Sequence, residues 1–415
     1  MRKPILFVPG FPASELRDKT SGRTVFPPSL STLADPAKKS ALIQNLIAVP
    51  GNLIAGPPIR DVLGIAKQAQ SLYDLLGGKF GYDTSELSDD FAAIGWDWRL
   101  GIGDGGVMNA IAAAVDRLGG GIVVIIHSTG GLVFRAFLEA RADLIPQFEQ
   151  VIAFGVPWRG TLKALRAMTV GEASGFLFAK ITAQESATIL SHAQAAYDLL
   201  PAELIADTSW MTQNYMRQLA ANAHAPFPQT FDDLPVTNVC GWGVDTWTSR
   251  TWMHSKDAGD GTVPVSSSSW IRGANVRTMF LPIGAYATAN IPYAHPRIWD
   301  SPPVLQLFEE VLHDAPRTPF LCAAADGDDY IDYDADVDVR LSAIAPDGGA
   351  LPGCKISVDI DGLKTDVPLN ADGRGAFILK RVGIKHNVAN DIYRFTVTFR
   401  WPGGSATRAV LIRSV

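Results

Sequence analysis

Short, continuously apolar runs alternate with amphipathic runs over the first three quarters of the chain. Five apolar runs are rich in β-branched residues and end at Gly, Pro or Ser: Ile5–Val8, Gly121–Ile126, Val151–Phe154, Val236–Cys240 and Val276–Leu281. Continuous hydrophobicity predicts strands of a parallel sheet that is covered on both faces. Helical spacing follows in residues 107–118, 130–142 and 303–312. The pattern therefore predicts an α/β architecture.

Two longer segments interrupt the alternation, residues 40–76 and 162–225. Both hold helical patterns and no convincing strand. We expect them to be cap or lid insertions over the carboxyl edge of the sheet, where long connections commonly lie. The apolar positions from Ile59 to Leu76 are interpreted as the buried face of a cap helix, and peripheral contact with lipid is the alternative.

The character of the chain changes near Pro316. Residues 326–338 contain seven aspartates. Alternating runs follow at residues 355–360, 376–380 and 393–400, separated by Asp-Gly, Pro-Gly and Gly-Gly turns. This pattern predicts a C-terminal all-β domain, an Ig-like sandwich over residues 319–415, after a catalytic domain over residues 1–318. The aspartate run lacks the spacing of an EF-hand, so acidic turns are a better interpretation of it than a calcium site.

Composition narrows the classes of partner. Of 415 residues, 47% are hydrophobic and 19% charged, which is typical of a well-packed globular protein. The net charge of −6, without any long Lys/Arg run, argues against a nucleic-acid partner. The three cysteines are too few and too scattered for a zinc site, and no metal is expected. Ile5–Val8 is too short for the core of a signal peptide, which favours a cytoplasmic protein, or a secreted one if a leader has been removed.

Ser128 lies where a predicted strand meets a predicted helix. The strand Gly121–Ile126 leads directly into His127-Ser128-Thr129-Gly130-Gly131. A serine on so sharp a turn, with small neighbours, is typical of a nucleophile elbow. The alternative is an ordinary junction with a serine N-cap. The backbone N–H of Thr129 begins the helix and is a candidate donor to an oxyanion.

An acid and a base follow the serine in the order Ser, Asp, His. Asp260 lies in a tight Gly-Asp-Gly turn that fixes its direction, and Asp257 is its nearby competitor. His295 lies just before the last predicted helix, which is the place this chain order requires of a general base. His254 is the rival base, because it lies close to Asp260 in the sequence.

The loop after the first predicted strand offers a second oxyanion donor. Ile5–Val8 runs into Pro9-Gly10-Phe11-Pro12. Pro12 has no N–H, so the amide of Phe11 is the best candidate. The alternative is a tight Pro-Gly turn, which is compatible with this role.

With these residues assembled, the chain resembles the lecithin:cholesterol acyltransferase-like family of α/β hydrolases, which includes lysosomal phospholipase A2-type and phospholipid:diacylglycerol acyltransferase-type enzymes. Six short motifs in the family's order carry the resemblance: Val8–Gly10, Gly95–Leu100, His127–Gly131, Gly155–Thr161, Leu199–Pro201 and Gly259–Pro264. The chain departs from the family at Ile126, where a small residue is usual. It also lacks the lid cysteines of animal members, and the segment from about residue 319 onward has no counterpart.

The resemblance implies a triad of Ser128, Asp260 and His295, with the amides of Phe11 and Thr129 as oxyanion hole. It also implies carboxylic-ester chemistry on a lipid-like acyl ester through an acyl-enzyme, without a cofactor. Trp98 and Trp158 belong to segments that should border the site, and either line an acyl pocket or pack the cap. An ester hydrolase is the first expectation, an acyltransferase the second, and a non-catalytic lipid- or partner-binding protein on the same fold the third.

Overall fold

The structure is a computed structural model. It describes residues 2–62, 66–67, 69–85, 87–171, 181–201, 234–247, 254–271, 275–283, 295–313, 320–326, 337–344, 350–360, 362–371, 373–379 and 392–413. The chain divides into two compact units, Met1–Gln306 and Leu307–Val415. The predicted domain boundary at 318/319 lies outside the described residues.

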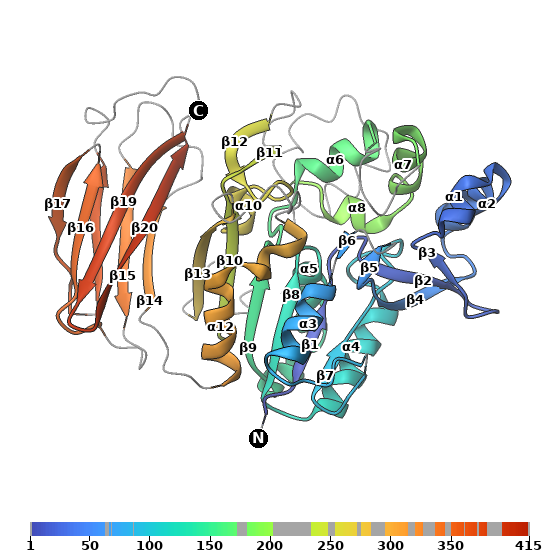
Figure 1. Cartoon of the computed structure of the whole chain (residues 1–415), viewed down its shortest axis with the longest axis horizontal. Helices are drawn as coiled ribbons and strands as arrows, with labels where there is room; N and C mark the ends of the chain where they lie inside the picture. The colour runs from blue at the N-terminus through green and yellow to red at the C-terminus, as the bar shows by residue number, and fades with distance from the viewer. Residues whose placement is uncertain are drawn as a thin grey trace. The chain divides into compact units, whose positions relative to one another are not determined.

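A six-stranded sheet forms the centre of the first unit (Figure 1). Its strand order is β13-β10-β9-β8-β1-β7, and every neighbouring pair is parallel. The strands are β1 (Ile5–Val8), β7 (Phe91–Ala93), β8 (Ile122–His127), β9 (Phe148–Phe154), β10 (Val236–Trp242) and β13 (Val276–Pro282). All five predicted strands are present in it. The parallel sheet with its helices is the α/β architecture that the sequence predicts.

The order of the strands reverses between β1 and β8. From β1 the chain moves to β7 on one side, and from β8 it moves to β9 and β10 on the other. The carboxyl ends of parallel strands at such a switch point are where α/β proteins bind their ligands. The two chain segments that begin there are the loop after Val8 and the turn after His127.

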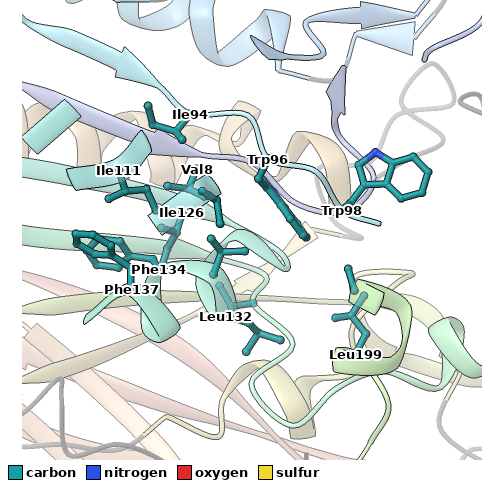
Figure 2. Packing of buried hydrophobic residues seen from close by; sticks show 14 of the residues in the cluster. Val8, Ile94, Trp96, Trp98, Ile111, Ile126, Leu132, Phe134, Phe137 and Leu199 are labelled. Atoms are coloured by element: carbon teal, nitrogen blue, oxygen red, sulfur yellow. The ribbon is translucent and has the colours of Figure 1, made fainter. Parts of the chain in front are cut away.

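Helices cover both faces of this sheet. On one face α4 (Gly105–Leu118) and α5 (Gly130–Ala140) bury apolar side chains against Val8 and Ile126, as Figure 2 shows. On the other face Tyr73 of α3 (Gln70–Gly78) contacts the rings of Phe7 and Phe91 edge-on. Because the strands are buried on both sides, their apolar runs are continuous.

The first insertion differs from its prediction. Strands β2 (Ser14–Asp18), β3 (Thr24–Phe26) and β4 (Leu53–Pro58) form an antiparallel sheet, and β5 (Asp61–Val62) pairs with β6 (Ala66–Lys67). The prediction of no strand in residues 40–76 was therefore wrong. Strand β4 forms by pairing with the distant β2, a contact that local periodicity does not report. Helix α3 packs against one face of the main sheet and is not a cap helix.

The second insertion is helical in its described parts, as predicted. It contains α6 (Leu162–Thr169), α7 (Ala183–Leu190) and α8 (Gln194–Asp198). Thr182 and Glu185 form a capping box at the start of α7. Helix α2 (Pro36–Ile47) follows α1 (Leu30–Ala34) and runs into the first insertion. Its Lys39 forms a 2.9 Å ion pair with that same Glu185, so α2 contacts the second insertion. Residues 172–180 and 202–233 lie outside the described part.

Short elements lie between the main strands: η1 (Ala142–Gln147), β11 (Val244–Trp247), β12 (His254–Gly259) and α10 (Val265–Ser268). The segment η5 (His295–Asp300) follows the last of these strands. Helix α12 (Pro302–Leu312) spans the division between the units. Across the described ranges, no helix combines the length and apolarity needed to cross a membrane.

The second unit consists of antiparallel strands, as predicted. One sheet has the order β14-β15-β18 and the other β17-β16-β19-β20. The strands are β14 (Phe320–Asp326), β15 (Val337–Ile344), β16 (Lys355–Ile360), β17 (Leu363–Val367), β18 (Arg374–Leu379), β19 (Ile392–Trp401) and β20 (Gly404–Arg413). Most of the aspartate run, residues 327–336, lies outside the described residues.

Candidate active site

Ser128 lies on a sharp turn between β8 and α5. Its φ is 51°, and it is the one non-glycine residue with positive φ in the described part of the chain. A β-carbon makes this conformation unfavourable, so the surrounding structure must hold it. The Ser128 N–H donates to the Phe154 carbonyl of β9 at 2.9 Å. The helix cap is Thr129, without a side-chain capping bond, so the N-cap interpretation of Ser128 does not apply. The geometry is that of an elbow.

Ile126 occupies the place where an elbow usually has a small residue. Its side chain is fully buried against the α4/α5 face, and it pairs with Val8 of β1 (Figure 2). The bulk of Ile126 therefore lies in the core and away from the turn. This explains how the chain tolerates its departure from the family pattern.

The loop after β1 comes very close to Ser128. A β-carbon at Gly10 would lie 2.7 Å from the Ser128 β-carbon and 3.2 Å from its Oγ. Only glycine fits this approach. Phe11 follows immediately, so both predicted donor residues, Phe11 and Thr129, lie beside Ser128. The Thr129 amide also lies at the N-terminus of α5, where the helix dipole is positive.

Asp260 and His295 are hydrogen-bonded to each other. The His295 Nδ1–H donates to Asp260 Oδ2 at 2.5 Å, and both side chains are buried. The other carboxylate oxygen accepts from the amides of Thr262 at 3.0 Å and Val263 at 2.7 Å. Three donors thus fix the direction of the carboxylate, and the carboxylate fixes the imidazole. Nε2 is the ring nitrogen that this arrangement leaves for proton transfer.

The turn after β9 brings the pair and the serine to one edge of the sheet. A β-carbon at Gly155 would lie 2.8 Å from Asp260 Oδ2 and 3.1 Å from His295 Nδ1. The preceding residue, Phe154, holds the Ser128 amide. The hydrogen bonds among the described residues do not include one from Ser128 Oγ to His295. Such bonds are often long before substrate binds.

His127 contacts the same histidine from the other side. Its Nε2 lies 3.0 Å from the His295 carbonyl oxygen, and the two rings are 4.8 Å apart. Burial, with the nearby His295, holds the pKa of His127 well below its ordinary value. Side chains alternate along a strand, which predicts that His127 points away from Ser128. This local rule did not reveal that His127 contacts His295, which lies 168 positions later in the chain.

The two competitors, Asp257 and His254, belong to β12, and their side chains lie outside what the structure describes. The hydrogen-bonded acid and base are Asp260 and His295. No group of three or more His, Cys, Asp or Glu within the described ranges is arranged to hold a metal ion.

The two predicted substrate-binding tryptophans are buried. Trp98 is completely buried, contacts the Phe11 and Phe26 rings edge-on, and its Nε1 has no hydrogen-bond partner among the described residues. Trp158 donates from Nε1 to Asn238 Oδ1 at 3.2 Å. Trp98 thus contacts the loop after β1 through Phe11, and Trp158 packs into the core. Their role in substrate binding stays a prediction.

A known family matches part of the chain that carries these residues. Residues 66–271 match the model of the family described as Lecithin:cholesterol acyltransferase. Through this stretch the chain is similar to that family. The match includes Ser128 and Asp260, whereas Phe11 and His295 lie outside it, so the assignment of those two rests on the geometry. A search among curated proteins finds no significant match.

Solved structures similar to the chain come from two groups of proteins. Bacillus licheniformis lipase BlEst2 in mature form is 14% identical, with a TM-score of 0.31, and the match covers 75% of this chain and 92% of the lipase. A bacterial immunoglobulin-like domain from the M. primoryensis ice-binding adhesin is 17% identical, with a TM-score of 0.17, and the match covers 22% of this chain and 94% of that domain.

Proposed function

We propose that the protein is a serine carboxylic-ester hydrolase that acts on lipid-like acyl esters. The observation that carries this proposal is the buried Asp260–His295 pair at the edge of the sheet where Ser128 forms a strained turn. The match of residues 66–271 to the Lecithin:cholesterol acyltransferase family supports acyl-ester chemistry. A protein that only binds lipid has no need of this combination.

The residues suggest a two-step mechanism. His295 Nε2 takes the Ser128 hydroxyl proton while Oγ attacks the ester carbonyl, and the Thr129 and Phe11 amides donate to the resulting oxyanion. Asp260 stabilises the imidazolium. The tetrahedral intermediate then expels the alcohol, which takes its proton from His295, and leaves an acyl-enzyme. Water, deprotonated by His295, attacks this ester, and the acid leaves as Ser128 regains its proton.

Turnover of p-nitrophenyl esters of increasing chain length tests the proposal. We expect activity that falls to background in Ser128→Ala, because no other group can form the acyl-enzyme. A preference for long chains would support a lipid-like substrate. Equal rates in wild type and Ser128→Ala, or no turnover of any ester or of phospholipid vesicles, would contradict the proposal and favour a non-catalytic binding protein.

Acyl transfer is the second candidate, favoured by the family that the chain matches. The acyl-enzyme is the same, and an alcohol replaces water in the second step. Adding a long-chain alcohol to the assay should then divert acyl groups from free acid into a new ester. An acid yield that does not change with the alcohol would exclude transfer to this class of acceptor.

We further propose that the C-terminal strands form an Ig-like sandwich. Phe377 of β18 contacts Phe395 of β19 at 5.8 Å between ring centroids, although these strands belong to different sheets. The two sheets therefore share one core, as in a sandwich.

A further inference from the structure

The histidine beside the nucleophile holds the backbone of the general base. A carbonyl oxygen only accepts hydrogen bonds, so at 3.0 Å from the His295 oxygen the His127 Nε2 must carry the proton and donate it. Both residues are buried, so water does not compete for this bond. The bond joins β8 directly to the first residue of η5.

Trp299 packs against His127. Its ring lies edge-on at 4.8 Å from the His127 ring, and it also contacts Phe7 and Phe154 of the sheet. The Trp299 Nε1–H donates to Ser71 Oγ of α3 at 2.9 Å. Segment η5 is thus fixed at His295 by His127, and at Trp299 by the sheet and α3.

A neutral histidine suits this place. The titratable groups that face His127 in the described part of the chain are His295 and, through it, Asp260. Burial keeps the pKa of His127 well below that of an exposed histidine, so its ring stays uncharged where a general base works. It supplies a donor without placing a second charge beside the imidazolium.

We propose that His127 is a positioning residue for ester hydrolysis, which sets the distance between Ser128 and His295 by anchoring the His295 carbonyl. This rests on the proposed function. Asp260 fixes only the ring direction, through Nδ1. The bond from His127 fixes the backbone that carries the ring, and His127 is covalently joined to Ser128. One dipeptide therefore carries both the nucleophile and the anchor of its base.

The test compares two replacements of His127. His127→Phe keeps an aromatic ring without a donor, and His127→Gln retains an amide donor near the position of Nε2. We expect kcat to fall between about 10- and 100-fold in His127→Phe with KM nearly unchanged, because small displacements of catalytic groups have effects of this size. His127→Gln should recover most of the lost kcat. Wild-type kcat in His127→Phe, or an equal loss in both variants, would overturn the proposal.

Tyr82→Phe is the matched control. The Tyr82 hydroxyl also donates to a backbone carbonyl, that of Lys3, at 2.8 Å, but this carbonyl lies just before β1. Its loss should lower the melting temperature without changing kcat. If His127→Phe does not fold, His127→Asn, whose amide is too short to reach the carbonyl, replaces it in the comparison with His127→Gln. A wild-type kcat in His127→Asn would equally overturn the proposal.

A second readout does not depend on turnover. In protein labelled with ¹⁵N-histidine, the Nδ1–H signal of His295, assigned by its loss in His295→Gln, should persist in His127→Gln and be lost or displaced in His127→Phe. An unchanged signal in His127→Phe would overturn the positioning role. Absence of ester turnover in the wild type would instead contradict the proposed function alone.

Discussion

At the scale of single residues, the site depends on close approaches that leave no room for substitution. Gly10 lies against Ser128, and Gly155 lies against Asp260 and His295. The sequence predicted the Ser, Asp and His from their local motifs and their order. It could not predict the contact of His127 with His295, because residues far apart in the chain meet there only after the sheet has formed.

Gly10→Ala should impair catalysis without unfolding the protein. The new methyl group would meet the Ser128 β-carbon at 2.7 Å, so either the serine or the oxyanion loop must move. We expect kcat to fall by about 100-fold, as for displaced catalytic groups in general. Steady-state kinetics with a short-chain ester, alongside thermal melting, checks this. Wild-type kcat in Gly10→Ala would show that the loop and Ser128 do not approach as described.

The burial of His127 makes stability depend on pH in a definite direction. The pKa of folded His127 lies well below the 6.5 of an exposed histidine, so below pH 6.5 the unfolded chain binds a proton that the folded chain does not. Stability is therefore unaffected by this group above that pH and falls as the pH decreases, by up to about 1.4 kcal/mol per pH unit. Urea unfolding between pH 8 and 5 should show a weaker acid dependence in His127→Gln, and identical slopes would contradict this account.

At the scale of elements, a buried arginine links the first insertion to the loop after β7, and an ion pair within that loop orients its guanidinium. Arg99 donates from Nε to Asp97 Oδ1 at 2.9 Å and from Nη2 to Oδ2 at 2.6 Å. Its guanidinium also donates to the carbonyls of Asn45, Ala48 and Leu53, which lie around the end of α2 and the start of β4. The sequence identified Gly95–Leu100 only as a family motif. In the structure its arginine binds the backbone around the end of α2 and the start of β4.

Arg99→Ala should be strongly destabilising, because it leaves the Asp97 carboxylate buried and unpaired together with three carbonyls. Breaking a buried pair in this way typically costs about 3–5 kcal/mol. Arg17→Ala is the control, since Arg17 pairs with Glu15 in a more exposed setting and should cost at most about 1 kcal/mol. Urea unfolding of both variants measures the loss in free energy of unfolding. Equal losses in Arg99→Ala and Arg17→Ala would contradict this role of Arg99.

The sequence predicted those elements whose structure depends on their own residues, and missed elements that depend on pairing with distant segments. The five predicted strands were found because burial on both faces shows directly in their continuously apolar composition. β7 was missed because Phe91–Ala93 has only three residues. The strands of the first insertion were missed because they depend on pairing between β2 and β4.

At the scale of the whole molecule, the C-terminal unit has a core of its own. Its buried cluster comes entirely from residues 341–399: Leu341, Ala343, Leu351, Ile356, Val358, Val367, Phe395, Val397 and Phe399. A unit whose buried side chains contact one another does not need the rest of the chain to exclude water from them.

Residues 319–415 expressed alone should therefore fold. We expect a β-rich circular dichroism spectrum and a single cooperative thermal transition, because one core unfolds as one unit. The variant Val397→Ala, which empties part of that core, should lower the midpoint of this transition. A fragment without a cooperative transition would contradict the predicted division of the chain.

The central claim is that Ser128 is a nucleophile activated by His295. The most direct measurement is reaction of the full-length protein with a fluorophosphonate, followed by intact mass and peptide mapping. The account predicts one adduct per chain, on Ser128, absent in Ser128→Ala and formed at least about 100-fold more slowly in His295→Gln. No adduct on the folded wild-type protein, an adduct on another serine, or equal rates in wild type and His295→Gln would contradict it.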